Sequence, residues 1–174
     1  MAKRSFTARL LRLLKHRWLD DADTRKAIPP DMLQRLKQRV AASENRHSGE
    51  IRICVEAGLP ASYIWNDSTP RERAVAMFAK MGMWDTDYNN GVLIYLLLAE
   101  HAIEIVADRG LSKRVPPEEW QAMVRRMGAA FREGHFEDGL MHALEEVSAL
   151  LVQHFPLAPG ESNSNELPDE PLLG

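Results

Sequence analysis

An uninterrupted apolar block, Val92 to Leu98, is followed after a gap of four residues by a second strand-like run, Ile103 to Ala107. A block that is apolar at nearly every position predicts a central strand covered on both faces. The gap is too short for a crossover, so the two strands must form an antiparallel hairpin. If its turn centres between residues 99 and 101, Asp108 lies opposite residues 91–93.

The remaining patterns predict helices around a small mixed sheet, an α/β fold. Ile51, Ile53 and Val55 alternate with polar neighbours, which predicts another strand with one buried face. The single cysteine, Cys54, excludes an internal disulfide. Helical spacing and proline starts predict helices over about residues 6–18, 30–46, 70–81, 117–131 and 136–155. We expect a helix and linker over residues 1–28, one α/β domain over 29–155, and a disordered acidic tail over 156–174.

The N-terminal segment has the pattern of a basic amphipathic helix. Residues 1–18 carry six basic side chains and no acid, whereas residues 133–174 carry nine carboxylates and no Lys or Arg. The residue pattern slightly favours a helix that docks on its own domain. The alternative is a peripheral anchor to anionic lipid, worth about 1 kcal/mol per basic residue near the surface. Its surface residues would be Arg9, Arg12, Lys15 and Trp18. Nucleic acid is disfavoured, because the basic pattern does not continue beyond this helix.

Hydrophobic runs limit the expected location. The longest, residues 92–99, has eight residues, and a membrane span needs about 20. Basic residues interrupt the N-terminal leucines, so a cleaved signal peptide is not expected. The sequence therefore predicts a cytoplasmic protein, at most peripheral at the inner membrane.

Directly before the apolar block lies an oxygen-rich segment, Asp85-Thr86-Asp87-Tyr88-Asn89-Asn90-Gly91, which we call the acidic loop. Asp, Asn and Gly are common in plain turns, because they tolerate left-handed backbone angles. The same oxygens suit a divalent cation, and the hairpin register brings a fifth oxygen-bearing side chain towards them. The predicted ligands are Asp85, Asp87, Asn89, Asn90 and Asp108, with Ca²⁺ ahead of Mg²⁺ because a pliable loop fits its roughly 6–8 ligands.

Two further residues are second-rank candidates at this site. Glu50 would join the same edge if the first two strands are parallel. Arg109 could neutralise Asp108 or Asp87 by a salt bridge, which is the ordinary structural explanation of an acid beside a base.

Several known motifs are excluded. The loop is not an EF-hand, because its glycine falls at the seventh place and Leu96 at the twelfth. A helix rather than a strand precedes Asp85, which argues against an Asp-x-Asp phosphatase nucleophile. His135 and His142 have no neighbouring ligands that would suggest zinc. No phosphate-binding glycine loop and no nucleophile elbow occurs.

Three segments together resemble the TPM domain family, which includes many bacterial proteins and a plant thylakoid-lumen protein of photosystem II repair. They are Ser48-Gly49-Glu50-Ile51, Asn89-Asn90-Gly91-Val92-Leu93-Ile94, and Phe131-Arg132-Glu133-Gly134-His135-Phe136-Glu137-Asp138-Gly139-Leu140. The resemblance covers about residues 45–155. It implies a three-layer α/β/α sandwich, a divalent-cation site on the acidic loops and an acid phosphatase activity. Only the five predicted ligands carry over.

Two functions follow from these expectations. The first is a cation-binding interaction domain with an unidentified protein partner, acting in protein maintenance at the membrane face. The alternative is a metal-assisted acid phosphatase in which Asp85 or Asp87 positions water. Arg109 and Arg52 are the only nearby candidates for a phosphate clamp, so the binding domain is favoured.

Overall fold

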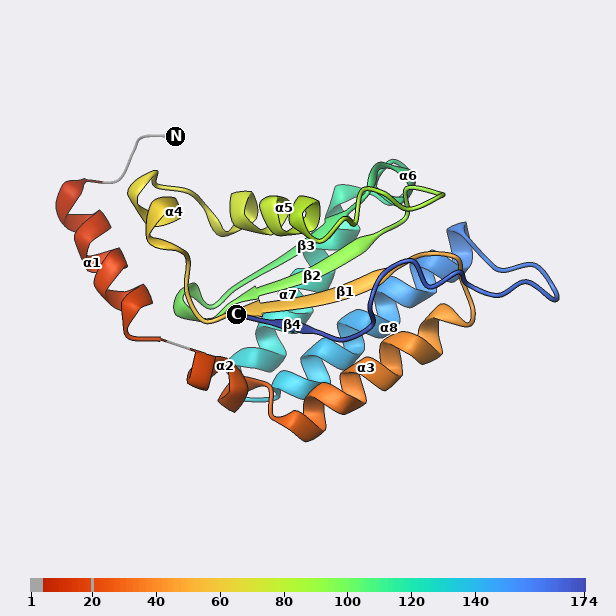
Figure 1. Cartoon of the computed structure of the whole chain (residues 1–174), viewed down its shortest axis with the longest axis horizontal. Helices are drawn as coiled ribbons and strands as arrows, with labels where there is room; N and C mark the ends of the chain where they lie inside the picture. Colours follow the sequence, from red (N-terminus) through yellow and green to blue (C-terminus); the bar gives the residue numbers. More distant parts are fainter. Residues whose placement is uncertain (1–4, 20) are drawn as a thin grey trace.

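At the centre of the protein is a four-stranded mixed sheet in the order β3-β2-β1-β4 (Figure 1). The computed structural model describes residues 5–19 and 21–174. The strands are β1 (Ile51–Glu56), β2 (Val92–Leu97), β3 (Ala102–Ala107) and β4 (Leu172–Leu173). β1 runs parallel to β2 and β4, and β2 pairs antiparallel with β3. The predicted hairpin is confirmed, and its register pairs Val92 with Ala107.

Helices cover both faces of this sheet (Figure 1). One face packs on α3 (Pro30–Glu44), α7 (Pro117–Arg132) and α8 (Phe136–His154), and the other on α4 (Ala61–Trp65) and α5 (Pro70–Lys80). Side chains alternate along a strand, so Ile94 joins the first core and Tyr95 the second. The predicted three-layer α/β/α sandwich is confirmed. The shorter helices are α1 (Phe6–Arg17), α2 (Asp21–Ala27), η1 (Leu98–Glu100) and α6 (Arg109–Ser112).

Two parts of the sheet differ from the prediction. Every residue of β1 is buried, although alternation predicted a mixed outer face. The reason is pairing across the second core, where the Glu56 carboxylate binds the guanidinium of Arg73 and accepts a hydrogen bond from the Tyr95 hydroxyl (2.6 Å).

The expected disordered tail ends instead as β4. Gly174 donates its N–H to the Val55 carbonyl (2.9 Å) and accepts a hydrogen bond from the Ala57 N–H (2.7 Å). These bonds cover the outer edge of β1, which would otherwise present unpaired backbone groups. Composition does not reveal such pairing, because main-chain groups form it.

The N-terminal helix α1 docks on its own domain through the polar side chains of Arg12 and His16, together with the half-buried Leu13. Arg12 was predicted at a membrane surface, but its side chain is buried and its guanidinium binds the Glu100 carboxylate. His16 also contacts Glu100 (2.9 Å). Within the described part of the chain, we find no helix long and apolar enough to cross a bilayer.

Candidate functional site

The acidic loop lies at the end of the sheet where β2 begins. Asp85 and Asp87 are exposed. Asn89 adopts a positive φ of 53°, its N–H donates to the Thr86 carbonyl (3.1 Å), and the Asn90 N–H donates to the Thr86 hydroxyl (3.2 Å). Such hydrogen bonds and a left-handed asparagine are typical of a turn. They explain the local sequence in part and leave the two aspartates free to face solvent.

The hairpin register brings Asp108 to this loop. Its N–H donates to the Gly91 carbonyl (2.9 Å), and its Oδ1 accepts the Arg109 N–H (2.6 Å) as the N-cap of α6. The other carboxylate oxygen, Oδ2, is buried and has no hydrogen-bond partner among the described residues. A buried charged oxygen without a partner is costly, so this atom marks a place where a ligand would be stabilising.

Glu50 and Asp108 flank Gly91 across three strands. The Val92 N–H donates to the Glu50 carbonyl (2.8 Å), which extends the β1–β2 register by one residue. Because paired residues point to the same face of a sheet, both carboxylates lie on the α5 face with the glycine between them. The Met83 carbonyl oxygen occupies the space over Gly91, 2.4 Å from where a Cβ would stand. Gly91 therefore lets the loop backbone cross directly over the sheet.

A second glycine, Gly110, allows α6 to pack closely against the acidic loop. The Gly110 N–H donates to the Asn89 carbonyl (2.8 Å). A Cβ at Gly110 would stand 2.4 Å from the Asn89 carbonyl oxygen and 2.6 Å from that of Tyr88. These are backbone atoms, which cannot move aside as a flexible side chain can. The absence of a side chain at Gly110 therefore allows the acidic loop to lie close to Asp108.

We expect Gly110→Ala to displace the loop and to lower the free energy of unfolding by about 1–3 kcal/mol, as overpacking does. Denaturant unfolding followed by circular dichroism measures this change. The control is Gly128→Ala in α7, where a Cβ meets only side-chain atoms at 3.6 and 3.7 Å, so no loss is expected. Equal stability of the two variants would contradict the close packing of α6 on the loop.

The two asparagines of the predicted site form hydrogen bonds within the protein. The Arg109 Nε donates to Asn89 Oδ1 (2.8 Å), so Arg109 binds an amide rather than the aspartates that the sequence suggested. Asn90 is fully buried; its Nδ2 donates to the Ser48 hydroxyl (3.2 Å), and its Oδ1 has no partner among the described residues. Among those residues, no three His, Cys, Asp or Glu side chains converge as a metal site. The five-ligand set remains a prediction.

The C-terminal segment also reaches this edge, a contact that sequence reasoning missed. The backbone N–H groups of Glu166 and Leu167 donate to the Glu50 carboxylate (3.2 and 3.3 Å). Glu166 in turn accepts a hydrogen bond from the Asp87 N–H (3.4 Å). Burial raises the pKa of Glu50, although these two amide hydrogen bonds oppose the shift. No motif links residue 166 to the loop, so only the folded chain reveals this neighbour.

Glu44 lies beneath the same segment. Its carboxylate accepts the Ile51 N–H (3.1 Å), and the Asp169 carboxylate lies close by. Burial raises the pKa of Glu44 to about 9, and the charges of Glu50 and Asp169 add to the shift. Nearby, burial lowers the pKa of His47 to about 4. At neutral pH this group of residues therefore contains a protonated acid and a neutral histidine.

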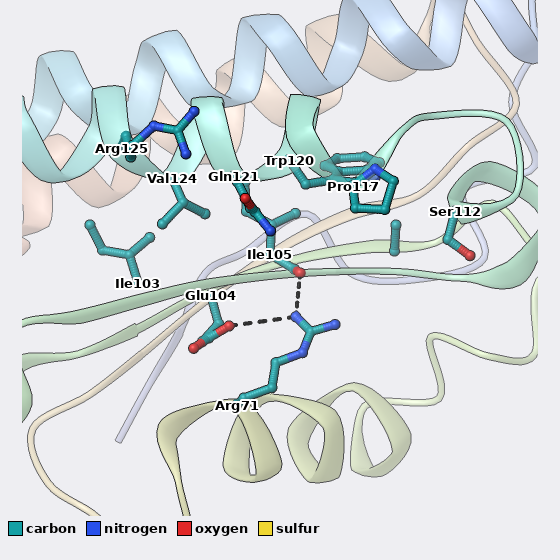
Figure 2. A pocket seen from close by; sticks show the side chains of 11 residues that line it. Arg71, Ile103, Glu104, Ile105, Ser112, Pro117, Trp120, Gln121, Val124 and Arg125 are labelled. Atoms are coloured by element: carbon teal, nitrogen blue, oxygen red, sulfur yellow. Dashed lines mark hydrogen bonds and ion pairs between the residues drawn. The ribbon is translucent and has the colours of Figure 1, made fainter.

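A separate hollow of about 480 Å³ lies between β3 and α7 (Figure 2). Trp120 and Val124 project into it from α7, and Arg71 reaches the strand from α5. The Arg71 guanidinium donates to the Ile105 carbonyl (2.5 Å) and lies 3.6 Å from the Glu104 carboxylate. A charged side chain on an edge strand disfavours pairing with another chain. None of the predicted ligands lines this hollow.

Comparison with known proteins gives a family and a fold. A family model for the TPM domain matches residues 22–150. The chain is similar to the NMR structure of the BA42 protein from the psychrophilic bacterium Bizionia argentinensis, with a TM-score of 0.73 and 24% identity over 84% of this chain and 95% of that chain. It is also similar to the N-terminal domain of a P. gingivalis protein, with a TM-score of 0.60 and 19% identity over 74% of this chain and 81% of that chain. No curated protein matches. At these identities the two structures show a shared fold alone.

Proposed function

The chain belongs to the TPM domain family. On this basis we propose that it is a cation-binding interaction domain, in which the acidic loop and Asp108 bind a divalent cation, Ca²⁺ in preference to Mg²⁺. The cation would order the acidic loop and so shape the surface that a protein partner meets. This function requires no nucleophile. It rests on the donor set at the β2 end of the sheet.

The observation that carries the proposal is the Asp108 Oδ2 atom, which is buried and lacks a hydrogen-bond partner among the described residues. Asp108 is held in place by its N–H bond to Gly91 and by its capping bond to Arg109. A bound cation would satisfy the remaining oxygen. Water would do so more weakly, because a carboxylate binds charged partners more strongly than neutral ones.

The acidic loop can supply further oxygens. Asp85 and Asp87 are exposed, and small changes in the loop could turn their carboxylates toward Asp108. Asn89 could join if its Oδ1 released Arg109. Ca²⁺ accepts variable numbers and directions of oxygen ligands, with water completing its shell, whereas Mg²⁺ requires near-octahedral geometry. A loop that must adjust therefore favours Ca²⁺.

The alternative function is a metal-assisted acid phosphatase, and the position of Arg109 favours it. Its guanidinium lies on the acidic loop, bonded to Asn89, where it could bind a phosphoryl oxygen. A cation there would polarise the phosphoryl group, and Asp85 or Asp87 would position water. If phosphatase turnover occurs and survives both Asp85→Ala and Asp87→Ala, these residues have no part in catalysis.

Calorimetric titration with Ca²⁺ and Mg²⁺ tests the cation site. We expect one Ca²⁺ site in the unaltered protein and at least tenfold weaker binding in Asp108→Asn, since one charged ligand is lost. Asparagine keeps an oxygen that can cap α6, so the fold is retained. The matched control is Asp138→Asn, which removes an exposed charge from α8. Equal Ca²⁺ affinity of the Asp108→Asn and Asp138→Asn proteins would contradict the proposed site.

A further inference from the structure

The α1 helix turns a row of large apolar side chains to solvent. The row begins at Phe6 and ends at Trp18, which is 85% exposed. Its members are Phe6, Leu10, Leu11, Leu14 and Trp18. An exposed apolar surface that is continuous along a helix marks an interaction site more often than scattered residues do. Trp65 of α4 extends it, because its ring contacts that of Phe6 edge to face at 6.1 Å between centroids.

Buried polar contacts hold the helix in this orientation. Arg12 binds the Glu100 carboxylate and donates to the Ser68 carbonyl (2.7 Å). The Leu59 N–H donates to His16 Nδ1 (2.8 Å), so the proton of a neutral imidazole is on Nε2 and is donated to Glu100 (2.9 Å). Turning the apolar row inward would break these bonds and leave a charge buried without its partner. The helix is therefore fixed with Arg12, His16 and the half-buried Leu13 on the domain and with the apolar row outward.

Basic side chains accompany the apolar row. Lys15 and Arg17 are exposed on the same helix, and residues 1–18 contain no acid. A shallow hollow of about 480 Å³ beside Leu11 is lined by Arg12, Lys15 and His16, with Glu100 as its one carboxylate. The apolar row and the exposed cations Lys15 and Arg17 together suit a bilayer, whose acyl chains are apolar and whose anionic headgroups are negatively charged. Tryptophan at the rim suits the interface between acyl chains and headgroups.

We propose that α1 is an interfacial helix that binds the protein to an anionic phospholipid bilayer. Its apolar row enters the boundary between headgroups and acyl chains, and its basic residues attract lipid phosphates. The occupant is a lipid surface rather than a second copy of this chain, because two copies meeting along α1 would bring like charges together.

Binding of α1 to a bilayer leaves the acidic loop exposed to solvent. α1 lies beside α4 at one end of the molecule, whereas the acidic loop and α6 lie at the other (Figure 1). A bilayer on α1 would not cover the acidic loop. Loss of lipid binding and loss of cation binding should therefore be separable.

Co-flotation of the full chain with vesicles tests the proposal. We expect binding to phosphatidylcholine vesicles that contain phosphatidylglycerol, weaker binding at high salt, and little binding to phosphatidylcholine alone. The double variant Leu11→Glu, Trp18→Glu should lower the partition coefficient by about tenfold or more, because both side chains lie in the apolar row. The control Val75→Glu places the same charge at an exposed apolar position on α5 and should bind as the unaltered protein does.

Three outcomes would overturn the proposal. These are absence of binding to anionic vesicles, equal loss of binding in the Val75→Glu control, and a dimer in light scattering that the Leu11→Glu, Trp18→Glu protein no longer forms. Both variants change exposed residues, and their far-ultraviolet circular dichroism should match that of the unaltered protein. Calorimetric Ca²⁺ binding should be unchanged in the double variant, which separates this result from the cation site.

Discussion

Replacing Glu56 by leucine should lower the free energy of unfolding by about 3–5 kcal/mol, the largest effect that we expect from a single side chain. Glu56 is buried at the end of β1, where its two carboxylate oxygens bind the Arg73 guanidinium in a forked pair. Oε2 also accepts the Tyr95 hydroxyl hydrogen (2.6 Å). The substitution would leave the largely buried Arg73 guanidinium without its acid and the buried Tyr95 hydroxyl without its acceptor.

Urea unfolding of the unaltered protein, of Glu56→Leu and of the double variant Glu56→Leu, Arg73→Met measures this effect. The double variant Glu56→Leu, Arg73→Met should recover part of the lost stability, because it removes the unpaired charge together with the acid. A loss below about 1 kcal/mol in Glu56→Leu would mean that the ion pair contributes no more than an exposed one. In that case the pairing would not explain why the outer face of β1 is buried.

The second large effect is a loss of stability with rising pH that depends on Glu44. Its pKa is about 9 in the folded protein, against an ordinary value of 4.5. The folded state therefore binds more protons than the unfolded state between these values, and stability falls as pH rises through that range. A shift of this size corresponds to at most about 6 kcal/mol. Because the folded protein can relax and admit water around a buried charge, we expect a smaller change of about 3 kcal/mol.

Glu44→Gln should remove most of this slope, because glutamine keeps an oxygen for the Ile51 N–H and carries no charge. Free energies of unfolding at about pH 5 and about pH 9 give the comparison. Glu119→Gln is the control, since Glu119 is exposed on α7. If Glu44→Gln and the unaltered protein lose stability in parallel across this range, Glu44 is not the titrating group.

Local patterns predicted the sheet because its strands have strong and distinct signals. The apolar block Val92 to Leu98 predicted a central strand covered on both faces, and the short gap after it required a hairpin. The predicted register placed Asp108 opposite residues 91–93, and in the structure its neighbour is Gly91. β4 was missed because a two-residue strand has no periodicity.

The orientation of α1 could not be predicted from its own residues. The apolar row suggested which side of α1 packs on the domain. Instead, Glu100, far along the chain, binds Arg12 and His16, so the apolar row faces solvent. Pairing between distant charges leaves no local pattern. A helix with this sequence could have docked by either side.

The candidate site was predictable as a region but not in its detail. Composition identified the acidic loop, and the hairpin register brought Asp108 to it. Glu50 was expected at the same edge if β1 and β2 were parallel, as they are. The close approach of the Met83 carbonyl to Gly91, and of the loop to Gly110, depends on backbone positions that a sequence does not specify. The Glu166 contact arises because the chain returns to β1 after α8.

Amide NMR during addition of Ca²⁺ tests whether a cation binds between the acidic loop and Asp108. We predict saturable shifts in the amides of residues 85–91 and 108–110, and none of that size in α1 or in the β3–α7 hollow. In Asp108→Asn the same shifts should need at least tenfold more Ca²⁺, while the other resonances keep their positions. Absence of shifts in residues 85–91 and 108, or equal shifts spread over the exposed acids of α8, would contradict a cation site at the acidic loop.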